Sequence, residues 1–458
     1  MKVVVCGAGV VGSNIAARLA SENIDVVVVD QSADLVRRVT DQHDVQGITG
    51  HASHPDVLEQ AGAGDADMLI AVTQIDEVNM IACQVAHSLF NVPMKIARVR
   101  EQSYQRPEWS ALFSREHMPI DIIISPETEV ANAVARRLHV PGAFDTVSLA
   151  EDRVRLVGVR CSEDCPIVQT PLRQLTSLFP DLNIRIVAIQ RSETVIVPHA
   201  DDHMEVGDGV YFVVDTDHIV RAMAAFGHEE PEAHRIVIIG GGNIGLGVAR
   251  QIERDDPLSS VRLIERDRER AVSVAAQVER TMVIHGDALD TEILEEARVS
   301  AAETIVAVTA DDEVNILSSL LAKRAGARRC ITLINKTTYG PLVGPLGIDV
   351  VVSPRALTVS TILQHVRRGR IRMLYSILDG AGEIIEADAL ETSRMVGVPL
   401  RDARLPSGVI IGALIRAGDV IIPRGDTIIR VHDRVVLFAI AASVKKVERV
   451  FSVRLDFF

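Results

Sequence analysis

Apolar runs of strand length alternate along this chain with helix-length stretches that place apolar residues on one face. DVVVVD at residues 25–30 and MLIAVT at residues 68–73 are two such runs. Strands that alternate with amphipathic helices predict βαβ units, because the helix carries the chain back before the next parallel strand begins. The pattern therefore predicts an α/β fold with doubly wound parallel sheets. The clearest helical stretches are Gly12–Glu22, Ala33–Gln42 and Asn79–Phe90.

The same series of elements occurs twice. KVVVCGAGVVG at residues 2–12 returns as RIVIIGGGNIG at residues 235–245, with all three glycines of the motif in register. DEVN follows a later apolar run in both copies, at Asp76–Asn79 and Asp312–Asn315. Self-similarity over such a length indicates an internal duplication. We therefore predict two Rossmann-type domains.

A smaller segment is duplicated as well. Residues 187–214 resemble residues 412–439, and both show short strands punctuated by glycine, aspartate and proline, which predicts a small, β-rich α+β domain. The polar stretch around Pro231 is typical of a linker. The residues shared by the two segments are Ala188, Arg191, Pro198 and Asp208, which return as Ala413, Arg416, Pro423 and Asp433. The predicted parts are a first Rossmann domain at 1–139 (N1), a first small domain at 140–231 (C1), a second Rossmann domain at 232–369 (N2) and a second small domain at 370–458 (C2).

Composition narrows the range of functions. The chain has 458 residues and a net charge of −14. This length requires more than one core, and the acidic balance argues against a nucleic-acid partner, because phosphate binding needs a concentrated basic surface. The apolar runs fall well short of the roughly 20 residues that a membrane-spanning helix needs. No signal peptide precedes the first predicted strand, so we expect a soluble protein.

The cysteines do not predict a disulfide framework or a metal centre. There are five of them, and the odd number is typical of a protein from the reducing cytosol. Cys161 and Cys165 are spaced CxxxC, but no second pair accompanies them. Because a structural zinc normally has four ligands, we expect no metal here.

Two glycine-rich loops are the strongest functional signal. Each one follows an apolar strand and opens a helix, which is the context in which GxGxxG binds a nucleotide. The first glycine permits the turn, the second lets a pyrophosphate approach the backbone, and the third lets the helix pack on the strand. The phosphate charge is then held by free N–H groups at the start of the helix. The candidate residues are Gly7, Ala8, Gly9, Val10, Val11 and Gly12 in N1, and Gly240, Gly242, Asn243, Ile244 and Gly245 in N2.

An acidic residue ends the second strand of each copy. Asp30 and Glu265 stand close to the spacing of about 20 residues at which such a carboxylate accepts hydrogen bonds from ribose hydroxyls. The carboxylate also repels a 2′-phosphate, which favours NAD(H) or another adenosine nucleotide over NADP. Arg266 weakens that exclusion in N2. The competing interpretation is a solvated carboxylate at a strand end.

Other candidate contacts differ between the copies. Asp287 follows the third apolar strand of N2, where it could reach the adenosine, whereas N1 has Gly50-His51-Ala52-Ser53 and leaves Ser53 as the candidate. Thr73 and Thr309 stand at the carboxyl ends of strands, where open α/β sheets bind ligands. Each threonine could equally just terminate its strand.

Two arginines distinguish N1 from N2. Arg98 and Arg100 follow a strand and could neutralise the distal phosphates of a nucleotide. The alternative is a solvated surface pair. Their counterparts in N2 are Asn335 and Lys336, so we expect the two copies to prefer different ligands.

The chain as a whole resembles the double-copy regulatory subunits of the RCK/KTN family. The resemblance covers essentially all residues and depends on the order N1-C1-N2-C2 more than on any one motif. Its markers are GAGVVG and GGGNIG with Asp30 and Glu265, GHASHP, AVTQIDEVNMIACQVA, AVTADDEVNILSSLLAKR, and the paired small domains.

The resemblance implies a cytoplasmic, peripheral subunit on the inner face of the cell membrane. It implies docking on a Trk-type potassium-translocating membrane subunit and assembly into a homotetrameric ring. NAD(H), ATP and ADP would bias the ring between conformations, each through its different affinity for the two states. Two differences argue against two fully equivalent nucleotide sites. N1 has His51 in place of an aspartate, and N2 has Asn335 where N1 has Arg98.

The main alternative is an NAD-dependent oxidoreductase. That class needs a substrate domain that supplies an acid or base near the nicotinamide. The small domains are short and β-rich, and the fourteen histidines of the chain are scattered. We therefore expect no enzymatic activity and no catalytic residues. A third interpretation, which the residues alone leave open, is a nucleotide-binding regulator without a membrane partner.

Overall fold

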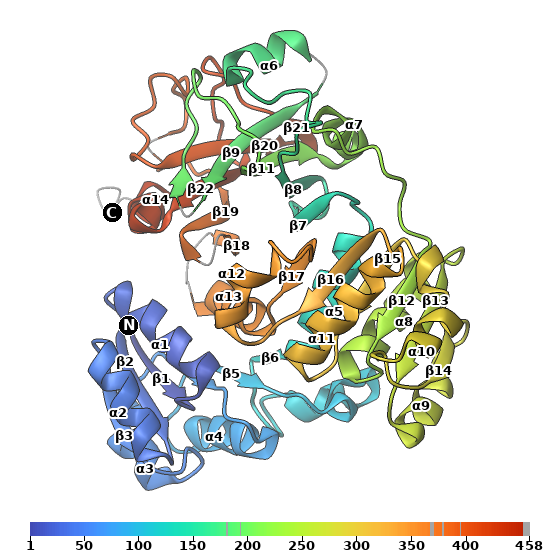
Figure 1. The fold of residues 1–458 in the computed structure, drawn as a ribbon. Coiled ribbons are helices and arrows are strands. Elements are labelled where there is room, and N and C mark those ends of the chain that lie inside the picture. The colour runs from blue at the N-terminus through green and yellow to red at the C-terminus, as the bar shows by residue number, and fades with distance from the viewer. Residues whose placement is uncertain (180–181, 193, 367–370, 378–379, 394, 452–458) are drawn as a thin grey trace. The chain divides into compact units, whose positions relative to one another are not determined.

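A computed structural model describes residues 1–179, 182–192, 194–366, 371–377, 380–393 and 395–451 (Figure 1). The chain forms two compact units. Unit 1 contains Met1–Ala131 and Ser353–Val366, and unit 2 contains Asn132–Val352 and Arg367–Phe458. Unit 1 therefore contains N1 up to Ala131, together with one helix from much later in the sequence.

Unit 1 is built on a six-stranded parallel sheet with the order β3-β2-β1-β4-β5-β6. The strand order reverses between β1 and β4, which is the topology predicted for a Rossmann-type domain. The strands are β1 (Lys2–Cys6), β2 (Asp25–Asp30), β3 (Gln46–Thr49), β4 (Met68–Ala71), β5 (Met94–Arg98) and β6 (Ile122–Ile124). The helices are α1 (Val10–Ser21), α2 (Ala33–Gln42), α3 (Pro55–Gln60), α4 (Asp76–Ser88), the first half of α5 (Pro126–Leu138), and α13 (Pro354–Val366), with short 3-10 helices at Ala63–Asp65, Gln102–Gln105 and Pro107–Phe113.

Both faces of this sheet are covered, which explains why β1 is apolar throughout. Val3 and Val5 join one buried cluster with α1, whereas Val4 and Cys6 join a second cluster with residues of α4. Alternate residues of a strand point to opposite faces, so a strand between two helical layers must be apolar at every position.

The helix α13 completes the α1 side of the unit 1 sheet. Its residues Ile362, Leu363 and Val366 are buried in the same cluster as Ile15 and Leu19 of α1. Two hydrogen bonds fix its position, one from Arg355 to the side chain of Asn14 at 2.5 Å and one from Thr361 to Glu129 at 3.2 Å. In sequence α13 follows the last strand of N2, but in space it belongs to the fold of N1.

The N2 domain in unit 2 repeats this topology, with the order β14-β13-β12-β15-β16-β17. The strands are β12 (Arg235–Ile239), β13 (Ser260–Glu265), β14 (Met282–His285), β15 (Thr304–Ala307), β16 (Arg329–Leu333) and β17 (Val350–Val352). The helices are α8 (Asn243–Asp255), α9 (Arg268–Ala275), α10 (Thr291–Glu296), α11 (Asp312–Arg324) and α12 (Gly340–Val343), with 3-10 helices at Val299–Ala301 and Thr337–Tyr339.

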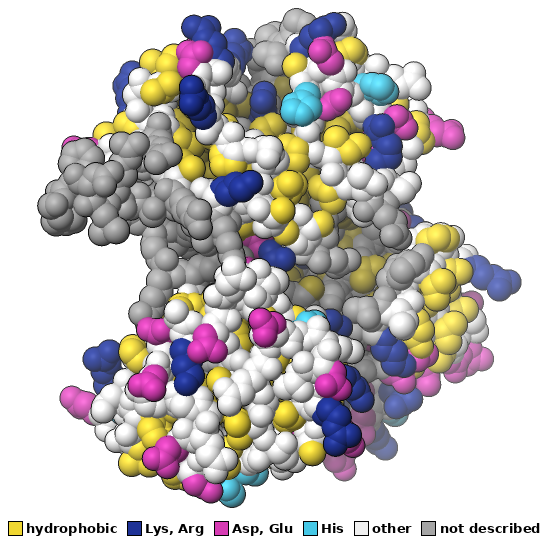
Figure 2. All heavy atoms as spheres, turned by 90° about the vertical axis from the view of Figure 1, so that its left-hand side faces the viewer, with side chains coloured by type: hydrophobic (Ala, Val, Ile, Leu, Met, Phe, Trp, Pro, Cys, Tyr) yellow, Lys and Arg dark blue, Asp and Glu magenta, His cyan; other side chains and the backbone are white. Residues whose placement is uncertain are grey.

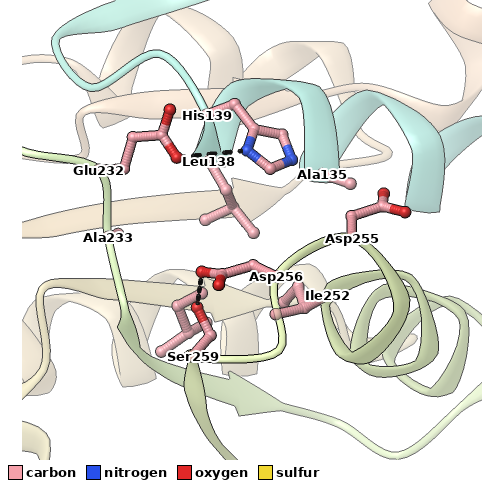
Figure 3. A pocket seen from close by; sticks show the side chains of 10 residues that line it. Ala135, Leu138, His139, Glu232, Ala233, Ile252, Asp255, Asp256 and Ser259 are labelled. Carbon is pink, nitrogen blue, oxygen red and sulfur yellow. Dashed lines mark hydrogen bonds and ion pairs between the residues drawn. The ribbon is translucent and has the colours of Figure 1, made fainter.

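The second half of α5 belongs to unit 2 and packs on N2. Its residues Ala135 and Leu138 line a small pocket together with Ile236 of β12 and Ile252 of α8 (Figure 3). Arg329 at the start of β16 donates a hydrogen bond to the carbonyl of Arg137 at 3.1 Å. The last helix of N1 in sequence thus contacts the sheet of N2, just as α13 contacts the sheet of N1.

C1 and C2 each contain a five-stranded antiparallel sheet, as predicted for a small, β-rich α+β domain. The order is β10-β9-β11-β8-β7 in C1 and β18-β19-β22-β20-β21 in C2. C1 contains β7 (Ala143–Leu149), β8 (Val154–Arg160), α6 (Leu172–Leu178), β9 (Ile184–Arg191), β10 (Thr194–Ile196), β11 (Gly209–Asp215), a 3-10 helix at Thr216–His218 and α7 (Ile219–Ala225). C2 contains β18 (Ile371–Ile377), β19 (Gly382–Asp388), β20 (Val409–Arg416), β21 (Asp419–Ile421), β22 (Arg434–Ile440), a 3-10 helix at Ala441–Ser443 and α14 (Val444–Phe451).

The C1 and C2 sheets share one apolar cluster. Leu156 and Val213 of C1 are buried in it with Ile384 and Phe438 of C2. The approach is close at Gly412, where a Cβ would lie 2.8 Å from a methyl group of Val213. The two small domains therefore pack face to face within the chain.

The repeated residues of the small domains form the same contact in both. Arg191 donates to both carboxylate oxygens of Asp208 at 3.0 and 2.9 Å, and Arg416 does the same to Asp433 at 2.9 and 2.7 Å. Both aspartates are almost fully buried, and a bidentate pair with arginine satisfies a buried carboxylate. The internal repeat therefore preserves a structural ion pair.

Candidate functional site

The glycine-rich loop of N1 lies between the carboxyl end of β1 and the start of α1. Gly7 has a φ of +111°, a conformation that residues with a side chain rarely adopt. Gly9 caps α1 without a side-chain hydrogen bond, so the N–H groups of the first helical turn point out of the end of the helix. Such groups, together with the helix dipole, favour a bound anion.

The third glycine of each loop is required for packing. A Cβ at Gly12 would overlap the carbonyl oxygen of Gly7 and lie 2.9 Å from its carbonyl carbon. In N2 a Cβ at Gly245 would overlap the carbonyl oxygen of Gly240 in the same way. The helix can therefore approach the strand only if this position has no side chain.

The acidic residue at the end of the second strand is hydrogen-bonded to the glycine loop. Asp30 accepts from the backbone N–H of Ala8 at 2.7 Å and of Ser32 at 2.9 Å. Glu265 accepts from Gly241 at 2.7 Å and from Asp267 at 2.8 Å. Each carboxylate is half-buried and keeps further lone pairs for a ribose hydroxyl. The structure thus brings the acid and the loop together in both copies.

The loop after the third strand adjoins this acid. In N1 the N–H of Gly50 donates to the carbonyl of Asp30 at 2.9 Å, and Ser53 hydrogen-bonds to His51 at 2.9 Å. The rings of His51 and His54 stack with their centroids 4.8 Å apart. In N2 Asp287 instead accepts from the N–H of Leu289 at 2.9 Å. Ser53 and Asp287 therefore follow a glycine, Gly50 or Gly286, that is bound to the acidic residue, but their own hydrogen bonds differ.

The repeated DEVN motif explains how the threonines are held. Asn79 is fully buried; its side-chain oxygen accepts from the N–H and the hydroxyl of Thr73, and its amide donates to the carbonyl of Arg98 at 2.9 Å. Asn315 makes the equivalent bonds to Thr309 and to Leu333. The asparagine fixes the ends of two neighbouring strands at the ligand edge. The repeat is visible in the sequence, but its pattern predicts no role for this asparagine.

The aspartate of the same motif holds the next loop. Asp76 accepts from the N–H groups of Arg100 and Glu101, both at 2.8 Å. Asp312 accepts from the N–H groups of Asn335 at 2.9 Å and Lys336 at 2.8 Å. These bonds align Arg100 with Asn335 and Glu101 with Lys336. The equivalent bonds of the two asparagines align Arg98 with Leu333, so the predicted pairing of Arg98 with Asn335 is wrong.

The cations of N1 are not fully paired. Arg100 forms an ion pair with Glu127, with 2.8 Å between Nε and Oε1. The Nε of Arg98 is buried and has no hydrogen-bond partner among the described residues. Burial and the neighbouring charge of Arg100 lower the pKa of Arg98. A phosphate group at this edge would supply the missing acceptor.

N2 has Leu333 at the position of Arg98, and its cation Lys336 lies at the position of Glu101 and forms an ion pair. Lys336 lies 2.6 Å from Glu313, and the hydroxyl of Tyr339 donates to the same carboxylate oxygen at 2.6 Å. These bonds lower the pKa of Glu313 to about 2. Asn335 donates to Asp312 at 3.0 Å. The two copies therefore offer different charges to a ligand.

One candidate residue was missed by the sequence analysis. Arg270 donates from Nε to the carbonyl of Gly241 at 2.7 Å and from Nη2 to the side chain of Asn243 at 3.2 Å. It lies across the N2 glycine loop. The helix-capping side chain of Asp267 accepts a hydrogen bond from the N–H of Arg270. In N1 the capping side chain of Ser32 accepts the same bond from Leu35, so Leu35 is the N1 counterpart of Arg270. Because Arg270 lies within an ordinary helix pattern, nothing in the sequence signalled its position.

The small pocket in Figure 3 is not a ligand site. Its volume is about 10 Å³, the size of one water molecule. It contacts β12 near the amino end, at Ile236, whereas ligands of parallel sheets bind at the carboxyl ends. Asp256 in this pocket accepts hydrogen bonds from Ser259 and His234, which lower its pKa to about 2.

Asp256→Asn is expected to lower stability at neutral pH by about 1 kcal/mol, a value reduced for solvent screening. A depressed carboxyl pKa stabilises the fold above the unfolded pKa of about 3.9. This stabilisation is lost as the pH falls from about 4 to about 2. Denaturant unfolding at pH 7 and at low pH measures it. Asp255→Asn is the control, because Asp255 is paired with the exposed Arg254. A difference between wild type and Asp256→Asn that stayed constant with pH would contradict this assignment.

Three further findings concern the surface charges, the helices and the side chains that could bind a metal. Over the face drawn in Figure 2, the described Lys and Arg side chains are interspersed with Asp and Glu and form no continuous basic field. Among the described residues, no helix is long and apolar enough to cross a membrane, and no group of His, Cys, Asp or Glu is arranged to hold a metal ion.

These features define a class of protein with two Rossmann-type domains, each followed by a small β-rich domain. In both Rossmann-type domains a carboxylate is hydrogen-bonded to the glycine loop. The chain matches the TrkA-N domain family at residues 3–126 and 236–354, and the TrkA-C domain family at residues 156–227 and 384–452. The chain therefore belongs to the TrkA family.

Relatives match the chain from end to end. The Trk system potassium uptake protein TrkA of Azorhizobium caulinodans is 56% identical over 458 residues, which is 100% of both chains. The protein of the same name from Vibrio alginolyticus is 42% identical over 455 residues, 98% of each chain. The fold is also similar to the GsuK RCK domain, with a TM-score of 0.59 at 20% identity over 99% of this chain and 95% of that one. The GsuK channel bound to NAD gives a TM-score of 0.58 at 19% identity, over 99% of this chain and 79% of the other.

Proposed function

We propose that this chain is the nucleotide-sensing regulatory subunit of a Trk-type potassium uptake system. The observation that carries the proposal is the complete four-part architecture with two glycine loops, each joined to a carboxylate, in a chain that matches TrkA proteins over its full length. The protein is a regulatory subunit and not an enzyme. Its role is to bind a ligand and pass on a change of conformation.

Adenine nucleotides are the proposed ligands, with NAD(H) and ATP or ADP as the candidates. The carboxylates of Asp30 and Glu265 favour a free ribose 2′-hydroxyl over a 2′-phosphate. The proposed contacts are the loop residues with Asp30, Ser53, Thr73, Arg98 and Arg100 in N1, and with Glu265, Asp287 and Thr309 in N2. The GsuK channel, which is similar in fold, has been solved bound to NAD. A ligand regulates only if its affinity differs between two states of the protein, and a factor of 100 corresponds to about 2.8 kcal/mol.

The two copies should prefer different nucleotides. The unpaired guanidinium nitrogen of Arg98 favours the charged terminal phosphates of ATP or ADP in N1. In N2, Lys336 is already bound by Glu313, and a dinucleotide without a terminal phosphate suits that site better.

Arg98→Gln is expected to weaken ATP binding by N1 about tenfold or more, because a charge-assisted hydrogen bond contributes about 1.5–3 kcal/mol. NADH binding should change much less. Isothermal titration with ATP and with NADH measures both. Lys336→Gln is the control for net charge, since it makes the same change of charge at a cation that is already paired with Glu313. Equal losses of ATP affinity in the two variants would contradict the proposed difference between N1 and N2.

The proposed assembly is a homotetrameric ring on the inner, cytoplasmic face of the cell membrane, where it docks on the potassium-translocating subunit. The family relation to Trk system proteins supports this partner. Deletion of the gene, with no second copy present, should impair growth and potassium uptake at low external potassium. Complementation with the wild-type gene should restore both. Potassium uptake that is unchanged by the deletion would overturn the proposed role.

A further inference from the structure

Two cysteines of C1 lie side by side in the interior although the segment between them is exposed. Cys161 and Cys165 flank the short loop that follows β8, and both belong to the same buried apolar cluster of C1. Both side chains are buried, whereas Ser162, Glu163 and Asp164 between them are exposed. The loop is therefore at the surface with its two sulfur atoms turned inward.

The environment of the pair distinguishes its two sulfur atoms. The Cys165 sulfur is hydrogen-bonded by Cys161 and by the backbone N–H groups of Ile167 and Val168, which lowers the pKa of Cys165. Its partner Cys161 has a raised pKa because it shares a proton with Cys165 and is buried. One sulfur is thus prepared to react as a thiolate, while its neighbour retains a proton.

The other cysteines of the chain have no such arrangement. Burial raises the pKa of Cys6 and of Cys330 to about 12. It also raises that of Cys83. All three lie within the Rossmann cores at 0% exposure, while Cys165 is 5% exposed beside a surface loop. These three thiols act as small apolar side chains, and the C1 pair differs from them in chemistry.

The second small domain shows that the fold does not need this pair. The N–H of Cys161 donates to the carbonyl of Asp208, as that of Ala389 donates to Asp433; the N–H of Cys165 donates to Ser162, as that of Ser393 donates to Leu390. Ala389 and Ser393 therefore occupy the equivalent positions of C2. Because the same loop forms without thiols, packing alone does not account for two adjacent cysteines in C1.

We propose that Cys161 and Cys165 are a redox-sensitive pair that a peroxide converts reversibly to an intramolecular disulfide. The Cys165 thiolate attacks one oxygen of hydrogen peroxide, the O–O bond breaks, and a sulfenic acid forms while hydroxide leaves and takes up a proton. The Cys161 sulfur then attacks the sulfenic sulfur. The S–S bond forms, the S–O bond breaks, and water leaves. Two thiols and one peroxide thus give one disulfide and two waters, and a thiol reductant reverses the change.

The loop that holds the pair contacts the beginning of the linker to N2. A Cβ at Gly227 would lie 3.0 Å from the carbonyl oxygen of Asp164 and 3.5 Å from the Cα of Cys165. Gly227 has a φ of +86° and stands two residues after the end of α7. A disulfide holds its two sulfur atoms about 2.05 Å apart. The loop must then shift against this turn, so the oxidation state of C1 affects the linker.

Treatment of the full-length protein with hydrogen peroxide is the test. Intact-mass measurement should show the loss of two hydrogen atoms, and peptide mapping under non-reducing conditions should place the cross-link between Cys161 and Cys165. Dithiothreitol should restore the original mass. Cys6, Cys83 and Cys330 should stay reduced, and oxidation should proceed faster as the pH rises through neutrality, because the thiolate is the nucleophile.

Two variants copy the residues that C2 already has and therefore should fold. Cys161→Ala should stop at the Cys165 sulfenic acid, which a dimedone probe traps, and Cys165→Ser should give no product at either position. The proposal is overturned if peroxide leaves both wild-type thiols reduced in the folded protein. It is equally overturned if both are oxidised to sulfinic acid without a cross-link, or if the cross-link forms only under conditions in which far-UV circular dichroism shows unfolding.

Discussion

Gly12→Ala is expected to destabilise unit 1 and to abolish nucleotide binding by N1. The new Cβ would overlap the Gly7 carbonyl oxygen, and both atoms belong to backbone segments that the sheet and α1 hold in place. Overpacking of this kind costs about 1–3 kcal/mol, and more where backbone must move. The shift also displaces the N–H groups that would bind the phosphates, so the affinity of N1 should fall with the stability.

Gly9→Ala is the control that separates the two effects. No atom lies within 4 Å of a Cβ at this position, and its φ of −66° suits any residue. Stability should therefore stay within about 0.5 kcal/mol of wild type. Nucleotide affinity should still fall, because the second glycine allows the pyrophosphate to approach the backbone. Differential scanning calorimetry and isothermal titration give the two readouts. A Gly12→Ala protein with wild-type melting and affinity would refute the packing role.

Asp30→Asn is expected to weaken binding of NADH and ATP to N1 by about 10- to 100-fold. Asparagine has nearly the same shape, but only one of its two terminal atoms accepts a hydrogen bond. It therefore cannot serve the N–H groups of Ala8 and Ser32 and also a ribose hydroxyl. Loss of a hydrogen bond to a charged group costs about 1.5–3 kcal/mol, which corresponds to this range of affinity.

Isothermal titration of Asp30→Asn beside Asp34→Asn provides the comparison. Asp34 is exposed in the first turn of α2, so its variant makes the same change of net charge a few residues away and should bind nucleotides as wild type does. Glu265→Gln should reduce only the binding assigned to N2. Unchanged affinity of the Asp30→Asn protein for both nucleotides would sink the assignment of N1 as an adenine-nucleotide site.

Local pattern predicted most of the two Rossmann sheets. The strand at Asp25–Asp30 and the helix at Ala33–Gln42 have the predicted bounds, because apolar runs and a serine cap mark their ends. Two helices begin earlier than predicted, at Val10 and at Asp76. The first begins directly after its glycine cap, and the second places its aspartate and glutamate in the first turn, where they suit the helix dipole.

The parts that could not be predicted depend on contacts between distant segments. The amphipathic pattern of α13 shows that one face must be buried, but periodicity does not say against which sheet. The roles of Arg270 and Asn79 could not be predicted for the same reason. Both side chains bind backbone groups that are distant in sequence and come close only in the folded chain. The candidate residues themselves followed from sequence because the glycine motif defines a backbone geometry.

The exchange of helices bears on how such a chain arose. A protein with a single Rossmann domain and a single small domain would lack the helix that covers the α1 side of its own sheet, and it would carry a spare helix that fits the sheet of another copy. Each of two such copies could supply the helix that the other lacks only in a domain-swapped dimer. The duplication is therefore best understood as the fusion of two partners that already depended on each other. Fusion also allowed the two halves to diverge, since a single gene could now alter one nucleotide site, or one pair of cysteines, without altering the other.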